Sequence, residues 1–185
     1  MAQPEQAETL SIAGALQWHE QVRTAVISDR RTQVQIAQGL LTAAPHSHLI
    51  GLTVDELHAH YGRLLKELEK LCCLNLLAAA EAILRTDYLY RAKKKAADAA
   101  SVEFRKLYKS KSKKASLVED LLVVWKNVTG EIAVIGELVG AFNYRNWLAH
   151  GRYWHPGLGQ AYDVSSLSII IELAFDALGP DFDWA

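Results

Sequence analysis

The sequence has few of the features that would place it in a special class of protein. It has two cysteines, four prolines and 11 glycines in 185 residues, and half of its residues are apolar. This composition excludes a disulfide framework, a collagen-like chain and a disordered chain, and it is typical of a globular protein. Because a chain of this length can bury a full core unaided, we predict a single domain over residues 1–185 without a cofactor.

The sequence also lacks signals for export and for membrane insertion. Its first residues contain neither the basic nor the apolar region of a secretory signal, and no apolar run approaches the roughly 18 residues of a spanning helix. We therefore expect a soluble, cytoplasmic protein that acts away from membranes. The only cysteines, Cys72 and Cys73, are neighbours in a leucine-rich segment, which favours buried core thiols.

Strand-like alternation of apolar and polar residues is missing as well. Long stretches rich in Ala, Leu, Glu, Lys and Gln instead predict an all-α fold, an up-and-down bundle of about five helices. The first helix is expected over about residues 7–41. The second and longest begins at a capping box formed by Thr53 and Glu56. Two further helices lie on either side of Gly130, and Asp163 caps the last.

The helix after Gly130 carries the residues that point to chemistry. Its apolar stripe continues by helical steps to Asn146 and His150, so we expect both polar side chains on the buried face, where they need hydrogen-bond partners. Arg145 precedes His150 by five residues, about 140° around an ideal helix. Joint action then requires the long arginine side chain, a helix break or a second subunit. The stripe itself consists of Ile132, Ile135, Val139 and Phe142.

The residues from Asn143 to Tyr153 resemble the signature of the HEPN superfamily, in which an arginine and usually a polar residue precede a histidine. Arg145, Asn146 and His150 match this pattern. The resemblance implies a metal-independent ribonuclease in which two protomers pair so that both motifs line one composite cleft. It also implies a toxin or defence setting, with an antitoxin or inhibitor protein as a partner.

The implied reaction suits these residue types. The 2′-hydroxyl of RNA attacks the adjacent phosphate and leaves a 2′,3′-cyclic phosphate and a 5′-hydroxyl. His150 is the candidate general base or acid, because an imidazole titrates near neutral pH. Arg145 would bind the phosphate and stabilise the developing charge, while Asn146 would orient His150 or donate to a phosphate oxygen. Glu81, in a small-residue face of the second helix, is expected to pair with Arg145.

The near-zero net charge hides an asymmetry along the chain. Residues 85–114 hold 11 of the 20 Lys and Arg residues and three acidic residues, a net charge of +8 against −9 for the rest. This basic segment is either an RNA-facing arm, with aromatic rings for stacking on bases, or a solvated helix and linker. The aromatic candidates are Tyr88, Tyr90, Phe104 and Tyr108, and the candidate substrate-binding residues are Lys93, Lys94, Lys95, Arg105 and, beyond the segment, Arg152.

Metal binding is not predicted. The pairs His46/His48 and His58/His60 are two residues apart, which separates them on a helix, and in a loop they lack the carboxylate or thiol companions of a zinc site. Two other functions stay open beside a ribonuclease. One is a catalytically inactive HEPN module that binds RNA or nucleotides, and the other is a helical interaction protein whose polar stripe is a dimer interface.

Overall fold

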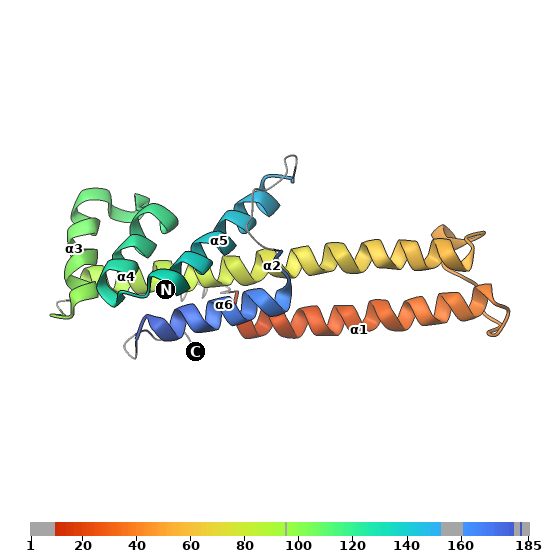
Figure 1. Cartoon of the computed structure of the whole chain (residues 1–185). Coiled ribbons are helices and arrows are strands. Elements are labelled where there is room, and N and C mark those ends of the chain that lie inside the picture. Colours follow the sequence, from red (N-terminus) through yellow and green to blue (C-terminus); the bar gives the residue numbers. More distant parts are fainter. Residues whose placement is uncertain (1–9, 95, 153–160, 180–181, 183–185) are drawn as a thin grey trace, which may run out of the picture. The chain divides into compact units, whose positions relative to one another are not determined.

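The computed structural model describes six α-helices and no strand within residues 10–94, 96–152, 161–179 and 182, which confirms the all-α fold class (Figure 1). Within the same residues, no helix has both the length and the apolar character needed to cross a membrane. The helices are α1 (Ile12–Ala37), α2 (Val54–Lys93), α3 (Ala99–Lys111), α4 (Leu122–Thr129), α5 (Ile132–Ala149) and α6 (Val164–Ala177).

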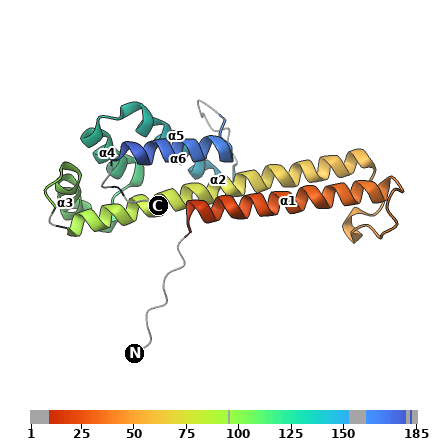
Figure 2. The ribbon, with the colours of Figure 1, turned by 90° about the horizontal axis from the view of Figure 1, so that it is seen from below.

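The chain divides into two compact units. One comprises residues 13–72, in which α1 and the first half of α2 form a hairpin, side by side in both views (Figures 1 and 2). A short 3₁₀ helix, η1 (Ser47–Leu49), lies in the loop that joins them. The other unit comprises residues 1–12 and 73–185. There α3 packs against α4, α4 against α5, and α5 against α6. The candidate catalytic residues Arg145, Asn146 and His150 belong to this unit.

The sequence signals for the start of α2 and the end of α4 are confirmed, whereas the predicted end of the first helix is wrong. The Glu56 carboxylate accepts from the backbone N–H of Thr53 at 2.8 Å, and the N–H of Glu56 donates to the Thr53 hydroxyl at 3.3 Å, which completes the capping box. Gly130 ends α4 with a φ of 77°. The first helix is shorter than the predicted 7–41, because Gly39 adopts a φ of 70° and the chain turns there.

The basic segment contains a helix that the sequence did not distinguish. α2 continues to Lys93, and α3 then follows as a separate helix, so the described residues hold six helices rather than about five. Asp98 caps α3 by accepting from the N–H of Ser101 at 2.9 Å. The apolar residues of α3 are interspersed with lysines, so the sequence showed no clear apolar stripe for this helix. The segment is therefore largely helical rather than a linker.

Two of the aromatic residues expected to stack on bases lie in the core instead. Tyr88 is 2% exposed and Phe104 is fully buried, with ring centroids 5.4 Å apart in an edge-to-face arrangement. Phe104 also packs edge-to-face on Trp125 at 5.5 Å. The prediction that Tyr88 and Phe104 stack on bases is therefore wrong. Burying an aromatic ring removes its apolar surface from water, and this stabilises the fold more than an exposed ring does.

One cation of the basic segment is also structural. Arg91 is 5% exposed and donates to Asp87 at 2.7 Å and to Asp98 at 3.0 Å, while its guanidinium lies over the ring of Trp125. Burial raises the pKa of Asp87, although Arg91 opposes this rise. Arg91 therefore joins α2 to the start of α3 and adds no charge to the surface.

The N-terminus of α6 offers a test of helix capping. Asp163 accepts from the N–H of Ser166 at 2.7 Å, and the Ser166 hydroxyl accepts from the N–H of Asp163 at 3.0 Å. We expect Asp163→Ala to lower the free energy of unfolding by about 1 kcal/mol near pH 7, measured by urea denaturation. Asp163→Asn keeps an acceptor and should lose less, and Ser165→Ala, at an exposed neighbour, serves as the control.

The same cap predicts a pH dependence. The backbone N–H of Ser166 and then its side chain lower the pKa of Asp163. Because the pKa is lower in the folded state, the stabilisation is present above the unfolded value of about 3.9 and is lost as the pH falls through the folded value. The difference between wild type and Asp163→Ala should therefore shrink below about pH 4. A difference that is constant from pH 7 to pH 2 would contradict a charged cap.

Candidate functional site

The buried face of α5 differs from the predicted stripe. Ile132 is 62% exposed, and Asn146 and His150 are exposed, so the expectation that these two polar side chains lie on the buried face is wrong. Ile135 and Phe142 of the stripe are buried as predicted, whereas Val139 is half-buried and its neighbour Leu138 is fully buried. The buried residues of α5 are Ile135, Leu138, Ala141, Phe142 and Tyr144.

The corrected face leads to Arg145. Helical steps of three and four from Leu138 pass through Phe142 to Arg145, whose side chain is 31% exposed. Its Nη2 donates to Oε2 of Glu81 at 2.6 Å, and its Nη1 donates to Oδ1 of Asn146 at 3.1 Å. The predicted pairing of Arg145 with Glu81 is thus confirmed. The guanidinium is held between α2 and its own helix, at the edge of the core.

Glu81 holds a second arginine. Its Oε1 accepts from Nε of Arg85 at 2.7 Å, and Nη1 of Arg85 donates to the carbonyl of Ala115 at 3.2 Å. The Arg85 contact was not predicted, although its spacing of four residues from Glu81 is the usual signal for a helical ion pair. Two guanidinium groups share one carboxylate, so this cluster of Glu81, Arg85 and Arg145 keeps one positive charge for an anion.

His150 lies where α5 ends. It is the C-cap residue, with φ −89° and ψ 17°, and its backbone N–H donates to the carbonyl of Asn146 at 3.0 Å. Gly151 and Arg152 then turn the chain with φ values of 82° and 59°, and the N–H of Arg152 donates to the carbonyl of Trp147. Of the three conditions that would allow joint action of Arg145 and His150, a helix break is present, directly at His150.

An aromatic stack supports this end of α5. Tyr144 is 7% exposed and lies between Trp147 and Tyr162, with ring centroids 5.6 and 5.2 Å away and both interplanar angles 23°. A Cβ on Gly140 would lie 2.5 Å from the Tyr162 hydroxyl, so a glycine allows this close approach. The stack was not predicted, because Tyr162 is distant in sequence from α5. It fixes the segment before α6 against α5.

The predicted substrate-binding residues fall into different groups. Lys93 and Lys94 are exposed at the end of α2, and the Lys94 ammonium lies 5.0 Å from the centroid of the Tyr90 ring, itself 58% exposed. Arg152 is exposed as well. Arg105 instead donates to the carbonyls of Lys94 and Ala96 at 2.9 and 2.7 Å, so it holds the connection between α2 and α3. Lys95 lies outside the described residues.

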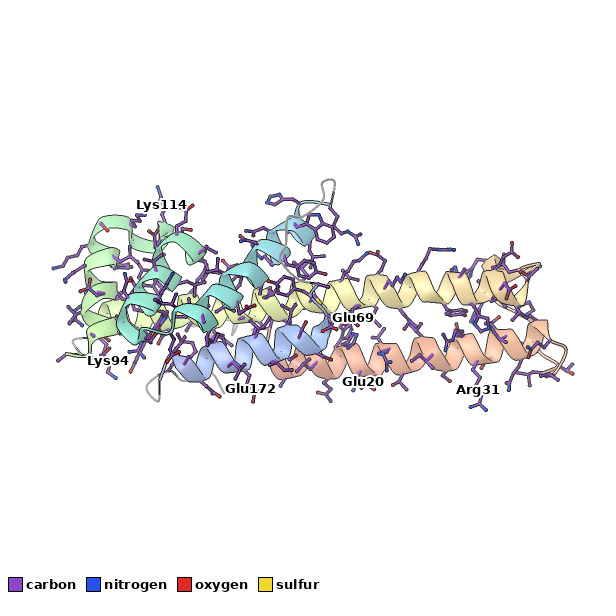
Figure 3. All side chains as sticks on the ribbon, in the orientation of Figure 1. Glu20, Arg31, Glu69, Lys94, Lys114 and Glu172 are labelled. Atoms are coloured by element: carbon purple, nitrogen blue, oxygen red, sulfur yellow. The ribbon has the colours of Figure 1, made fainter. Side chains whose placement is uncertain are left out.

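Other lysines of the basic segment add to its surface charge. Lys111 pairs with Asp120 and Lys106 with Glu103, each at 2.6 Å. Lys109, Lys113 and Lys114 are exposed, and the described residues offer them no ion pair. Lys94 and Lys114 lie at the two ends of α3 (Figure 3). The exposed cations therefore surround α3 rather than forming a run along one helix. We call Lys93, Lys94, Lys109, Lys113 and Lys114 the α3 lysines.

No family model matches the chain, and searches of curated proteins and of solved structures find no similar protein. The resemblance to the HEPN superfamily thus rests on the residues around Arg145 and His150.

The network around Glu81 predicts a measurable coupling. Glu81→Gln leaves two guanidinium groups without an anion between them, so we expect the free energy of unfolding to fall by about 1–3 kcal/mol. A double-mutant cycle with Arg145→Gln should give a coupling energy of about 1 kcal/mol. Denaturant titration of the four proteins measures both values. Glu119→Gln, at an exposed acid, is the control, and a coupling near zero would contradict the ion pair.

Proposed function

We propose that the chain is a metal-independent endoribonuclease of HEPN type, acting in the cytoplasm. The observation that carries the proposal is the placement of Arg145, held by Glu81 and Asn146 near the end of α5, in the same short segment as the exposed His150. An anchored guanidinium and an accessible imidazole are the two groups that phosphate-ester cleavage by an internal hydroxyl needs. The HEPN resemblance assigns these residues the same roles.

Arg145 binds the scissile phosphate in this proposal. Glu81 and Asn146 restrict its rotamers before the substrate arrives, which lowers the entropy lost on binding. The cluster of Glu81, Arg85 and Arg145 carries one net positive charge, which matches the single negative charge of a phosphodiester. In the transition state the phosphoryl oxygens gain charge, and a guanidinium that is already oriented stabilises that charge without reorganising.

His150 moves the protons. As a base it takes the proton of the 2′-hydroxyl, the 2′-oxygen bonds to phosphorus, and the bond from phosphorus to the 5′-oxygen breaks. The 5′-oxygen takes a proton from solvent water and His150 returns its own proton to solvent, which leaves a 2′,3′-cyclic phosphate and a 5′-hydroxyl. Because Oδ1 of Asn146 already accepts from Arg145, its amide N–H groups are the ones offered to a phosphate oxygen. This favours phosphate binding over the alternative role of orienting His150.

A second copy of the chain completes the cleft in this proposal. Large apolar side chains are exposed on α5 and α6 of the same unit, with Ile132 62%, Ile169 56% and Leu173 56% exposed. Ile169 and Leu173 lie one turn apart on the same face of α6, and a contiguous apolar surface of this kind favours an interface. The RNA backbone would then cross the α3 lysines and Arg152. A toxin or defence role, with an antitoxin or inhibitor protein as a partner, follows from the resemblance.

Cleavage in the presence of EDTA tests the proposal. Wild type should cut RNA but not its 2′-deoxy counterpart, and the products should carry cyclic-phosphate ends. We expect His150→Ala to lower the rate at least 100-fold. Asn146→Ala should lower it as well, whereas Asn143→Ala, at an exposed position one turn earlier, should keep wild-type activity. His58→Ala provides the histidine control.

Two outcomes contradict the enzyme. If wild type and His150→Ala are equally inert but bind RNA in a salt-sensitive way, the chain is an RNA-binding module. If both are inert, bind no RNA, and Arg145→Ala disrupts the dimer, the chain is an interaction protein.

The α3 lysines predict the salt dependence of RNA binding. Replacing Lys113 and Lys114 together by Gln should weaken binding to single-stranded RNA at low salt. It should also lower the slope of log K against log salt by about 1.4, since each phosphate contact contributes about 0.7. Filter binding or fluorescence anisotropy from 50 to 300 mM salt measures the slope. The matched control replaces Arg63 and Lys66, exposed on α2, and an equal loss there would contradict a specific RNA-facing surface.

A further inference from the structure

The first helix of the hairpin in the unit of residues 13–72 buries few of its apolar side chains. Only Ala15, His19 and Gln33 are buried in α1, and two of these are polar. The large apolar side chains of α1 all keep contact with solvent; they are Ile12, Leu16, Trp18, Val22, Val26, Ile27, Val34 and Ile36. A helix with apolar side chains on several faces is expected to pack on more than one neighbour. Packing against α2 therefore leaves α1 partly uncovered within this unit.

Polar groups occupy much of the seam between the two helices, which run side by side (Figures 1 and 2). Nε2 of His19 lies 3.3 Å from Oε2 of Glu69, and Asp29 accepts from the Tyr61 hydroxyl at 2.5 Å. Asp29 also accepts from Nε2 of His46, in the loop that joins the helices, at 2.9 Å. Buried apolar side chains gather at the loop end; they are Leu49, Leu57 and Tyr61. A unit of about 60 residues with a polar seam gains stability from association with a partner.

Three contacts fix which residues face one another across the hairpin. The residue numbers of the two partners add up to nearly the same value in each contact, as expected for antiparallel helices of equal rise. The contacts join Ala15 to Cys72, His19 to Glu69, and Asp29 to Tyr61. By the same register, Trp18 lies opposite Leu71, and the exposed Ala25 lies opposite Leu64.

Trp18, Leu64 and Leu71 lie on one side of the hairpin. Trp18 follows the buried Ala15 by three residues, and Leu71 follows the buried Leu68 by three, so both are turned about 60° from the seam in the same sense. Leu64 is turned about 40° in that sense from Leu68. Because the helices are antiparallel, the same sense of rotation leads to the same side. The three side chains are 40%, 44% and 52% exposed. We call this side of α1 and of the first half of α2 the hairpin face.

The hairpin face is large enough for a stable interface. α1 has 26 residues, which makes it about 39 Å long at 1.5 Å per residue, and two adjacent helices are together about 20 Å wide. The face therefore covers about 800 Å², which matches the area that each partner buries in a standard protein–protein interface. A dimer through this face needs no additional surface.

The two edges of the hairpin face differ in charge. The edge along α2 carries charged side chains, namely Glu56, Arg63, Glu67 and Lys70. The edge along α1 carries uncharged polar side chains, namely Gln17, Gln21, Ser28 and Thr32. In the register of the hairpin, each charged residue on α2 lies at the level of one uncharged residue on α1. When α1 of one copy lies on α2 of another, no two like charges therefore meet at these positions.

We propose that the hairpin face binds the same face of a second copy of the chain, with both loops at the same end. A two-fold axis along the hairpin then places α1 of each copy on α2 of the other at an unchanged level. Trp18 packs on Leu71 of the second copy, and Leu64 of the second copy packs on the small Ala25. All neighbouring helices are antiparallel, as in an up-and-down four-helix bundle. This interface depends neither on the proposed ribonuclease nor on the apolar side chains of α5 and α6.

The mass of the full chain in solution, measured by light scattering after size-exclusion chromatography, tests the inference. Leu64→Glu combined with Leu71→Glu should halve the assembled mass, because the interface would bury carboxylates without partners, and the dissociation constant should rise about 100-fold or more. Ala25→Glu should have the same effect from α1, at an exposed position. The matched control combines Ala59→Glu with Lys66→Gln, at exposed positions of α2 outside the hairpin face. It has the same spacing and the same change of charge, and it should keep the wild-type mass.

Three results would overturn the inference. One is a mass that the Leu64 and Leu71 double variant leaves unchanged while Ile169→Glu with Leu173→Glu reduces it, which would assign association to α6 alone. Another is an equal loss of mass in the matched control. The third is a wild-type chain that stays single at every concentration, and a lower midpoint of thermal unfolding in the double variant would then show that the chain's other unit covers the hairpin face. Circular dichroism checks that each variant keeps its helical content, and the mass is read whether or not the chain cleaves RNA.

Discussion

The ion pair between Glu81 and Arg145 is the constraint on which the candidate site depends. It joins α2 to α5 and sets the guanidinium at the edge of the core, where it is partly buried. Arg85 shares the carboxylate and extends the network to the backbone of Ala115. A single carboxylate thus links these elements and leaves the cluster of Glu81, Arg85 and Arg145 with one net positive charge.

In the basic segment, some residues are buried in the core and others keep their charge at the surface. Tyr88, Phe104 and Arg91 are buried, Arg91 because two aspartates and the Trp125 ring compensate its desolvation. Arg105 serves the turn between α2 and α3. The cations that remain on the surface surround α3. A segment with a net charge of +8 therefore offers an anion fewer contacts than its composition indicates.

The unit of residues 13–72 has its own polar centre. Asp29 connects α1 to the loop through His46 and to α2 through Tyr61, and hydrogen bonds from both lower its pKa although burial opposes this. The pKa of Cys72, raised to about 11 mainly by burial, keeps that thiol protonated at the other end of the hairpin. Asp29 is therefore the group through which α1, the loop and α2 are joined in this unit.

Local sequence patterns were enough to predict the all-α class, the capping box at Thr53, the cap at Asp163 and the end of α4 at Gly130, because these depend on contacts within a few residues. It also pointed to the pair of Glu81 and Arg145. Packing between elements was needed to show that Asn146 and His150 are exposed, that Tyr88 and Phe104 belong to the core, and that Asp29 contacts His46. Those outcomes depend on partners distant in sequence, which no pattern within a single helix contains.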